Sequence, residues 1–282
     1  MFNQLSSLMK AALFYGIAFA LILLMVLLGQ GLGGSIVALA PITASAAVLL
    51  MQFVVTRDGT TRAGWRILGL HHLGLRTWGF AILLPFLVML CTYGIAWSTG
   101  IGRLDQTALN RVFTLDGLMS ILNILVFSTI IDFLEEIGWR GYLLPHLLPL
   151  GRTRALLLSG LLHGIWHLPL ILLTPYYPAV VVLFLLTITG AGVFYGYLRL
   201  TSNSIWPVVL AHSAFNMFWT VFSAITVAVA SADVLEYWAG ESGVITLVVI
   251  VLVAAWLIYR LNRQPEAVPM TDKLVGQPLA PK

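Results

Sequence analysis

The sequence has little charge and almost no cysteine. Charged residues make up 9% of the 282 residues, whereas hydrophobic residues make up 60%. An ordinary soluble domain carries roughly 25% charged residues. The composition therefore excludes an ordinary water-soluble fold. Cys91 is the single cysteine, so an intramolecular disulfide is excluded. It lies inside an apolar run, which is typical of a small buried hydrophobic side chain.

Long unbroken apolar runs take the place of amphipathic stripes. A run of about 18 apolar residues can cross the hydrocarbon core as a helix, and backbone groups in lipid must be satisfied within the segment. We therefore predict an all-α membrane protein of about eight transmembrane helices. The expected spans are Ala11–Leu28, Ser35–Val55, Gly79–Trp97, Gly117–Leu134 (or longer), Ala155–Leu173, Ala179–Leu198, Ser204–Val227 and Gly243–Ile258.

These spans form one predicted membrane domain over residues 1–261, followed by a polar cytoplasmic tail over residues 262–282. No repeat of fixed period is visible. The first run is expected to be a true span and not a cleaved signal peptide. The final residues, Leu-Ala-Pro-Lys, do not form a prenylation box.

The basic residues predict how the chain lies in the membrane. The net charge is +4, but the Lys and Arg residues sit between apolar runs, so membrane orientation explains them better than nucleic-acid binding. With both termini in the cytoplasm, every Lys and Arg except Arg103 and Arg111 faces the cytoplasm. The Arg-biased, Gly- and Ala-rich composition and the short loops favour a bacterial protein. We therefore expect an integral protein of a bacterial plasma (inner) membrane.

The first polar cluster lies where the fourth span should end. It contains Asp132, Glu135 and Glu136 in a sequence that stays largely apolar. The helix is therefore expected to continue past the carboxylates and to end at Pro145. On such a helix Asp132, Glu136 and Arg140 share one face, and Glu136 is placed to pair with Arg140. Glu135 points away from that face and is expected to face a cavity.

Two further clusters place polar side chains inside predicted spans. His163 and His167 lie one turn apart in the fifth span, and His212 and Asn216 have the same spacing in the seventh. Taken alone, each cluster has a structural interpretation: a charged turn at a helix end, packed histidines, or hydrogen bonds between helices. Polar and ionisable groups inside a membrane are costly, however, and are functional by default.

The three clusters lie at similar depths in the cytoplasmic half of the predicted bundle, as a rise of about 1.5 Å per residue indicates. We therefore predict one polar, water-accessible pocket that opens toward the cytoplasm. A desolvated glutamate beside an imidazole can act as a general base on water. A histidine and an asparagine on a facing helix can donate hydrogen bonds to an oxyanion. This set is sufficient to hydrolyse an amide bond without a serine or cysteine nucleophile.

In this order the motifs resemble those of the CAAX-protease and bacteriocin-processing (CPBP, or Abi) family, which includes the prenyl-protein endopeptidases. The resemblance covers residues 115–220, where Glu135-Glu136-x-x-x-Arg140 precedes a histidine in the fifth span and then His212-x-x-x-Asn216. It implies an intramembrane endopeptidase. The implied roles are catalytic base for Glu135, water activation for His167, an oxyanion site for His212 and Asn216, and structural support for Glu136 and Arg140.

One residue departs from the family's pattern. The second motif is usually Phe-x-x-x-His, and His163 occupies the position of the phenylalanine. His163 could contact the pocket or replace a packing aromatic ring, and we favour packing. His163 and Asp132 are candidates for residues that contact the reacting side chains and do not react themselves.

The family is commonly labelled as metalloproteases, and the sequence leaves metal binding open. Glu135, His167 and His212 could hold a zinc ion with water as the fourth ligand. The chain contains no His-Glu-x-x-His motif. We favour a glutamate mechanism that requires no cofactor, with a divalent metal as the alternative.

Two other functions remain open: a membrane scaffold or immunity protein of the same fold that does not cleave peptides, and a transporter with a buried Glu/His relay. For the peptidase, the expected partners are the lipid bilayer and a membrane-associated protein or peptide, with no nucleic acid. A bacterial source makes a bacteriocin-like precursor more plausible than a prenylated protein. His71, His72 and His146 are expected to be surface or interfacial histidines.

Overall fold

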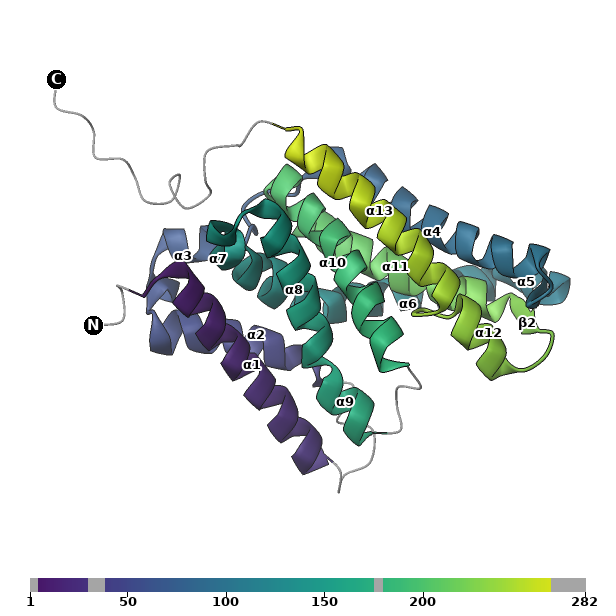
Figure 1. Ribbon diagram of the computed structural model, residues 1–282, viewed down its shortest axis with the longest axis horizontal. Helices are drawn as coiled ribbons and strands as arrows, with labels where there is room; N and C mark the ends of the chain where they lie inside the picture. The colour runs from purple at the N-terminus through teal and green to yellow at the C-terminus, as the bar shows by residue number, and fades with distance from the viewer. Residues whose placement is uncertain (1–4, 30–38, 175–179, 265–282) are drawn as a thin grey trace.

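A computed structural model describes residues 5–29, 39–174 and 180–264 and shows a bundle of helices (Figure 1). Six helical stretches in this part of the chain are long and apolar enough to cross a membrane, which confirms an integral membrane protein. They are Ser7–Gly29, Leu75–Ser98, Leu115–Leu150, Arg152–Leu173, Val181–Ser202 and Ala232–Asn262. The α-helices are α1 (Ser7–Gly29), α2 (Pro41–Leu50), α3 (Arg62–Arg66), α4 (Trp78–Ser98), α5 (Gln106–Val112), α6 (Leu115–Glu136), α7 (Leu144–Leu147), α8 (Arg152–Trp166), α9 (Leu168–Leu173), α10 (Val181–Ser202), α11 (Trp206–Ala224), α12 (Ala232–Ala239) and α13 (Val244–Asn262).

Two of the eight expected spans are not among these six. The second is shorter than expected, because α2 continues only through a π-helical turn to Val55, and residues 35–38 lie outside the described part. The seventh is α11, whose 19 residues are long enough. The polar side chains of His212 and Asn216 lower its mean hydropathy. A small antiparallel sheet, β1 (Gly102–Leu104) with β2 (Thr226–Ala228), adds strands to a fold that was expected to be wholly helical. The predicted tail lies outside the described residues from position 265 on.

Side-chain caps mark the starts of several helices. The Asp105 carboxylate accepts hydrogen bonds from two backbone amides at the start of α5, and Thr114 accepts one at the start of α6. Ser231 caps α12 in the same way. These caps satisfy amides that have no partner inside a helix. They fix where the apolar segments begin.

The fourth span continues past its carboxylates, as predicted, but it does not end at Pro145. After α6 the chain forms a π-helical segment, Ile137–Leu143, then α7 and a short 3₁₀ turn that ends at Leu150. Pro145 lies in the first turn of α7. Because the helical stretch is continuous here, this proline removes one backbone hydrogen bond from it. The π segment is important for the site, since π turns place side chains differently from an α-helix.

Glycines let α8 and α10 pack closely. A Cβ atom added at Gly160 would lie 2.6 Å from the carbonyl oxygen of Thr189, and one added at Gly192 would lie 2.5 Å from the Cα of Gly160. Gly164 meets the side chain of Ile188 in the same way. Small residues at such spacing let helix backbones touch inside a membrane. This contact fixes the position of α8, the helix that carries His163.

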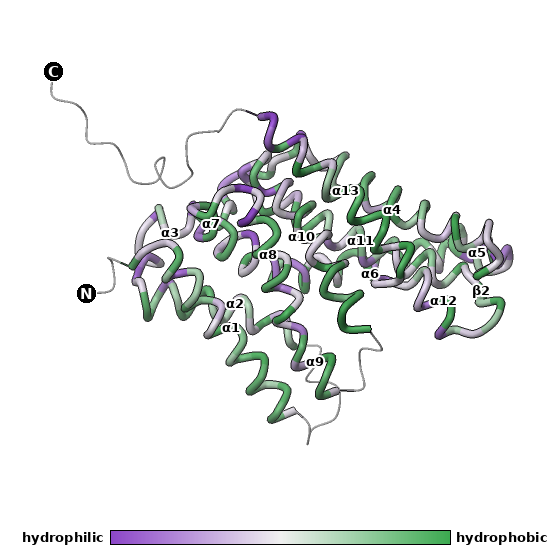
Figure 2. Tube along the Cα trace, viewed as in Figure 1, coloured by the Kyte–Doolittle hydropathy of each residue, from purple (hydrophilic) through white to green (hydrophobic). Residues whose placement is uncertain are grey.

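The basic segments gather at one end of the bundle. The Lys10 ammonium pairs with Asp58 at 3.0 Å, which joins the start of α1 to the loop that contains Arg57. Arg152, at the start of α8, donates to the carbonyl of Leu261, near the end of α13. Figure 2 shows hydrophilic segments around α3 and at the end of α13, and others at the opposite end around α5, β2 and α12. We call the end of the bundle that carries Lys10, Arg57 and Arg152 the basic end. The strand β1 and helix α5, which carry Arg103 and Arg111, lie far from it (Figure 1).

Two expectations about single residues are wrong. Cys91 is exposed, because it lies on the outward face of α4. His146 is buried, with 6% of its surface exposed, and its Nδ1 lies 2.7 Å from the carbonyl oxygen of Tyr142. The π segment and α7 carry it inside the bundle and not into a loop. His71 and His72 are exposed, as expected.

The distribution of basic residues makes a prediction about orientation. In a Cys91→Ser background, Thr60→Cys marks the basic end and Ala230→Cys marks the loop before α12, and both positions are exposed. By the positive-inside rule, a membrane-impermeant maleimide should label Thr60→Cys in inverted vesicles and Ala230→Cys in intact cells. The opposite labelling pattern would refute a cytoplasmic basic end.

Candidate active site

Three helices bring the polar clusters together around one cavity of about 270 Å³. Asp132 and Glu135 come from α6, and His163 comes from α8. His167 lies at the break between α8 and α9, where its own amide still donates to the carbonyl of Gly164. Helix α11 supplies the remaining polar residues. The predicted site residues that line the cavity are Asp132, Glu135, His163, His167, His212 and Asn216.

A buried ion pair lies behind the cavity. The predicted Glu136–Arg140 pair is present, with Nη1 of Arg140 2.8 Å from Oε1 and 3.0 Å from Oε2 of Glu136. Both side chains are 0% exposed. The guanidinium also lies over the ring of Tyr195, 5.1 Å from its centroid. Neither charged residue lines the cavity, so the pair supports the cavity residues and does not itself face a substrate.

Glu135 is held by a histidine. Its Oε2 lies 3.0 Å from Nε2 of His163, and Nδ1 of His163 lies 3.1 Å from Nη1 of Arg140. The His163 ring is fully buried and also stacks on Trp139, with 4.9 Å between ring centroids. His163 therefore packs against an aromatic ring and also contacts the pocket, whereas from the sequence these were alternatives and packing was favoured.

The third motif faces the other carboxylates. Nδ1 of His212 lies 2.9 Å from Oε1 of Glu136, and its Nε2 lies 3.8 Å from Oδ1 of Asp132. The Asn216 amide donates to the same Asp132 oxygen at 3.1 Å. The Tyr195 ring stacks on the His212 imidazole, with 5.0 Å between centroids. Two carboxylates and an aromatic ring thus fix the orientation of His212.

His167 has one nitrogen directed into the site. Its Nδ1 lies 3.0 Å from the backbone carbonyl oxygen of His163. A carbonyl oxygen only accepts hydrogen bonds, so Nδ1 carries the proton. In the neutral imidazole, the lone pair is then on Nε2.

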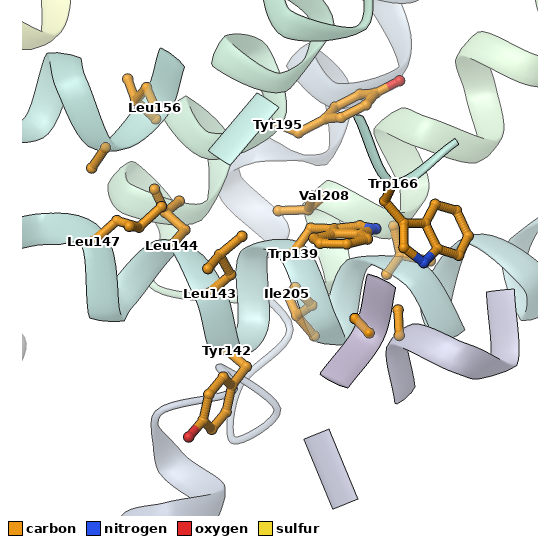
Figure 3. Packing of buried hydrophobic residues seen from close by; sticks show 14 of the residues in the cluster. Trp139, Tyr142, Leu143, Leu144, Leu147, Leu156, Trp166, Tyr195, Ile205 and Val208 are labelled. Carbon is orange, nitrogen blue, oxygen red and sulfur yellow. The ribbon is translucent and has the colours of Figure 1, made fainter. Parts of the chain in front are cut away.

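The cavity extends away from the basic end. Beyond the polar cluster, its lining comes from the earlier part of α6, from α9, from the first turns of α10 and from the loop before α13, including Phe127, Leu170, Phe184 and Glu241. On the other side the interior is filled by buried side chains, among them Trp139, Leu143 and Leu144 (Figure 3). A cytoplasmic basic end and a cytoplasmic opening were both predicted. The two predictions are incompatible for this cavity.

Two residues near the site were not identified from the sequence. Glu241 lines the cavity from the loop between α12 and α13. Its position between glycine and serine residues resembles an ordinary turn, so no helical spacing links it to the motifs. Tyr195 lies outside the three motifs, on α10, and contacts both Arg140 and His212. Its only sequence signal is an aromatic residue within an apolar run.

The residues do not fit a zinc ion as they are arranged. Glu135, His163 and His167 have ligand atoms within 4.8 Å of one another. A guanidinium can only donate, so Nδ1 of His163 accepts from Arg140 and Nε2 carries the proton. That nitrogen has no lone pair for a metal. The two remaining donors are fewer than the three protein ligands of a catalytic zinc site.

The set expected from the sequence does not fit a metal better. Among the described residues, the group that could hold a metal contains Glu135 and His167 but not His212. The ring nitrogens of His212 lie near Glu136 and Asp132.

A membrane-embedded cluster of carboxylates, imidazoles and an amide is thus the defining feature of the chain. Residues 117–218 match the family model described as type II CAAX prenyl endopeptidase Rce1-like. The chain therefore carries an Rce1-like domain over these residues, which confirms the resemblance. The matched segment is more than a third of the chain and contains all three motifs. No curated protein matches the chain.

The buried ion pair makes a prediction about stability. Glu136→Ala leaves the Arg140 guanidinium buried without its carboxylate, so the variant should lose about 3 kcal/mol or more of stability. A thermal melt in detergent measures the loss. Asp116→Ala is the matched control, because Asp116 is an exposed acid at the start of the same helix. Equal melting temperatures for the two variants would contradict a supporting role for the pair.

Proposed function

We propose that the chain is an intramembrane endopeptidase that hydrolyses a peptide bond of a membrane-associated protein or peptide. The Rce1-like domain suggests a protease, and the buried Glu/His cluster has the groups that such a reaction needs. One observation carries the proposal: within that domain, Glu135 lines the cavity and its carboxylate is hydrogen-bonded to His163. Its geometry suits a general base.

In the proposed reaction Glu135 removes a proton from a water molecule, and the resulting hydroxide attacks the peptide carbonyl. One carboxylate oxygen of Glu135 accepts from His163, so the other is available for water. Nε2 of His167 accepts the second hydrogen bond of that water. When the tetrahedral intermediate collapses, the C–N bond breaks and the protonated Glu135 returns its proton to the leaving amine.

The oxyanion of that intermediate needs hydrogen-bond donors. Asn216 donates one amide hydrogen to Asp132 and has a second to offer. His212 donates from Nδ1 to Glu136, and with both nitrogens protonated it also donates from Nε2. Donors fixed in place before reaction stabilise developing charge well in a site without bulk water.

We propose that this reaction requires no metal. The hydrogen bond from Arg140 to Nδ1 of His163 supports this, because it leaves the proton on the nitrogen that faces Glu135. We also propose that the basic end is cytoplasmic, in a bacterial plasma membrane. The substrate then reaches the cavity from the opposite half of the membrane. A membrane-bound peptide or precursor fits such access.

Peptidase activity in detergent, against a library of membrane-tethered peptides, tests the function. Glu135→Gln keeps the size of the side chain but removes the base, so cleavage should fall by about 10²- to 10⁴-fold or more. A chelator should leave the wild-type rate unchanged. Glu241→Gln is the matched control, since it makes the same change elsewhere on the cavity lining.

The outcomes separate the possible mechanisms. Equal cleavage by wild type and Glu135→Gln would refute the base assignment. Loss of wild-type activity on chelation, with recovery on adding zinc, would replace the metal-free mechanism with a metal-dependent one. Folded wild-type protein without cleavage of any peptide would contradict the proposed function.

A further inference from the structure

We propose that His163 is a positioning residue that orients the carboxylate of Glu135, at a place where the family's second motif carries phenylalanine. The proposal rests on the proposed function in one respect, the role of Glu135 as the reacting carboxylate. It adds a polar connection from the buried ion pair to the base. This connection runs from Glu136 through Arg140 and His163 to Glu135.

The direction of the hydrogen bonds along this connection is fixed by chemistry. Arginine has only donors, so the 3.1 Å contact makes Nδ1 of His163 the acceptor. The neutral ring then carries its proton on Nε2, which lies 3.0 Å from Oε2 of Glu135. Nε2 therefore donates to the carboxylate. Arg140 thus selects the one neutral tautomer of His163 that can hold an ionised Glu135.

The surroundings hold His163 in one position. The side chain is 1% exposed and the ring stacks on Trp139. Its backbone carbonyl accepts from His167. Arg140 is held in turn by two hydrogen bonds to Glu136. A donor that is fixed before reaction keeps Glu135 in one rotamer, with its second oxygen directed to the reacting water.

A phenylalanine at position 163 would reproduce only part of this arrangement. Its ring could stack on Trp139, but it offers neither an acceptor to Arg140 nor a donor to Glu135. Glutamine would reproduce the other part. Its amide oxygen can accept from Arg140 while its amide nitrogen donates to Glu135. The pair His163→Phe and His163→Gln therefore separates packing from hydrogen bonding.

The kinetic test compares these two variants with wild type on a cleaved peptide. We expect His163→Phe to lower kcat by about 10- to 100-fold, because a hydrogen bond to a charged group is lost near the reacting atoms. KM should change little, since the His163 side chain is only 1% exposed and its two ring nitrogens contact Arg140 and Glu135. His163→Gln should recover most of kcat. Equal kcat values for wild type and His163→Phe, or a greater loss for Gln than for Phe, would overturn the proposal.

A second measurement reports the tautomer directly and does not depend on activity. Nitrogen-15 NMR of histidine-labelled protein assigns the His163 signals by their absence in His163→Phe. We expect Nδ1 without a proton and Nε2 with one at neutral pH. The opposite tautomer would overturn the proposal even if His163→Phe failed to fold, in which case His163→Gln provides the assignment. Stoichiometric zinc binding by wild type that is lost in His163→Gln would also overturn it, because a metal-bound Nε2 cannot donate.

These outcomes stay distinct from a failure of the proposed function. If Glu135→Gln abolishes cleavage while His163→Phe matches wild type, the endopeptidase stands and the positioning role falls. If Glu135→Gln cleaves normally, the base assignment falls whatever the tautomer of His163.

Discussion

The arrangement of the site depends on one buried ion pair. Glu136 and Arg140 lie on adjacent turns and are both fully buried. Two opposite charges taken out of water stabilise each other when their geometry is good and further hydrogen bonds surround them. Glu136 accepts from His212 on α11, and Arg140 donates to His163 on α8. Tyr195 adds the face of its ring from α10. Four helices are thus oriented around a single pair.

The π segment after α6 explains how this pair is accommodated. Its backbone bonds join residues five apart, so the helical partner of the Arg140 carbonyl would be Pro145, which has no amide hydrogen. The Arg140 carbonyl accepts from Nε of Arg199, a buried residue that also donates to the carbonyl of Ile67. Gly69 makes room for this guanidinium, since a Cβ there would lie 2.8 Å from its central carbon. The segment that carries Arg140 is therefore tied to α10 and to the loop before α4.

Residue spacing alone predicted part of this structure. Helical periodicity is local, so the Glu136–Arg140 pair and the shared faces of the other motifs followed from the sequence. The tautomer of His163 did not, because it depends on contact between α6 and α8. Glu241 was missed for a similar reason: a loop residue reaches a site only through the path of the chain. The direction of the cavity depends on which interior positions are filled by large side chains such as Trp139, and no single span shows this.

The position of the polar cluster limits the conformation of a segment that reacts there. In an intact α-helix the backbone carbonyls accept hydrogen bonds within the helix, whereas the proposed oxyanion donors, His212 and Asn216, lie on the cavity lining. A peptide carbonyl that accepts from these donors must leave its helical hydrogen bond, so a membrane-spanning helix that reacts there must be locally unwound. In a lipid environment unwinding leaves backbone amides and carbonyls without partners, at a cost of several kcal/mol each. Chain ends, and segments interrupted by glycine or proline, incur less of this cost. Discrimination among membrane polypeptides can thus rest on how easily a segment unfolds, in addition to which side chains it carries.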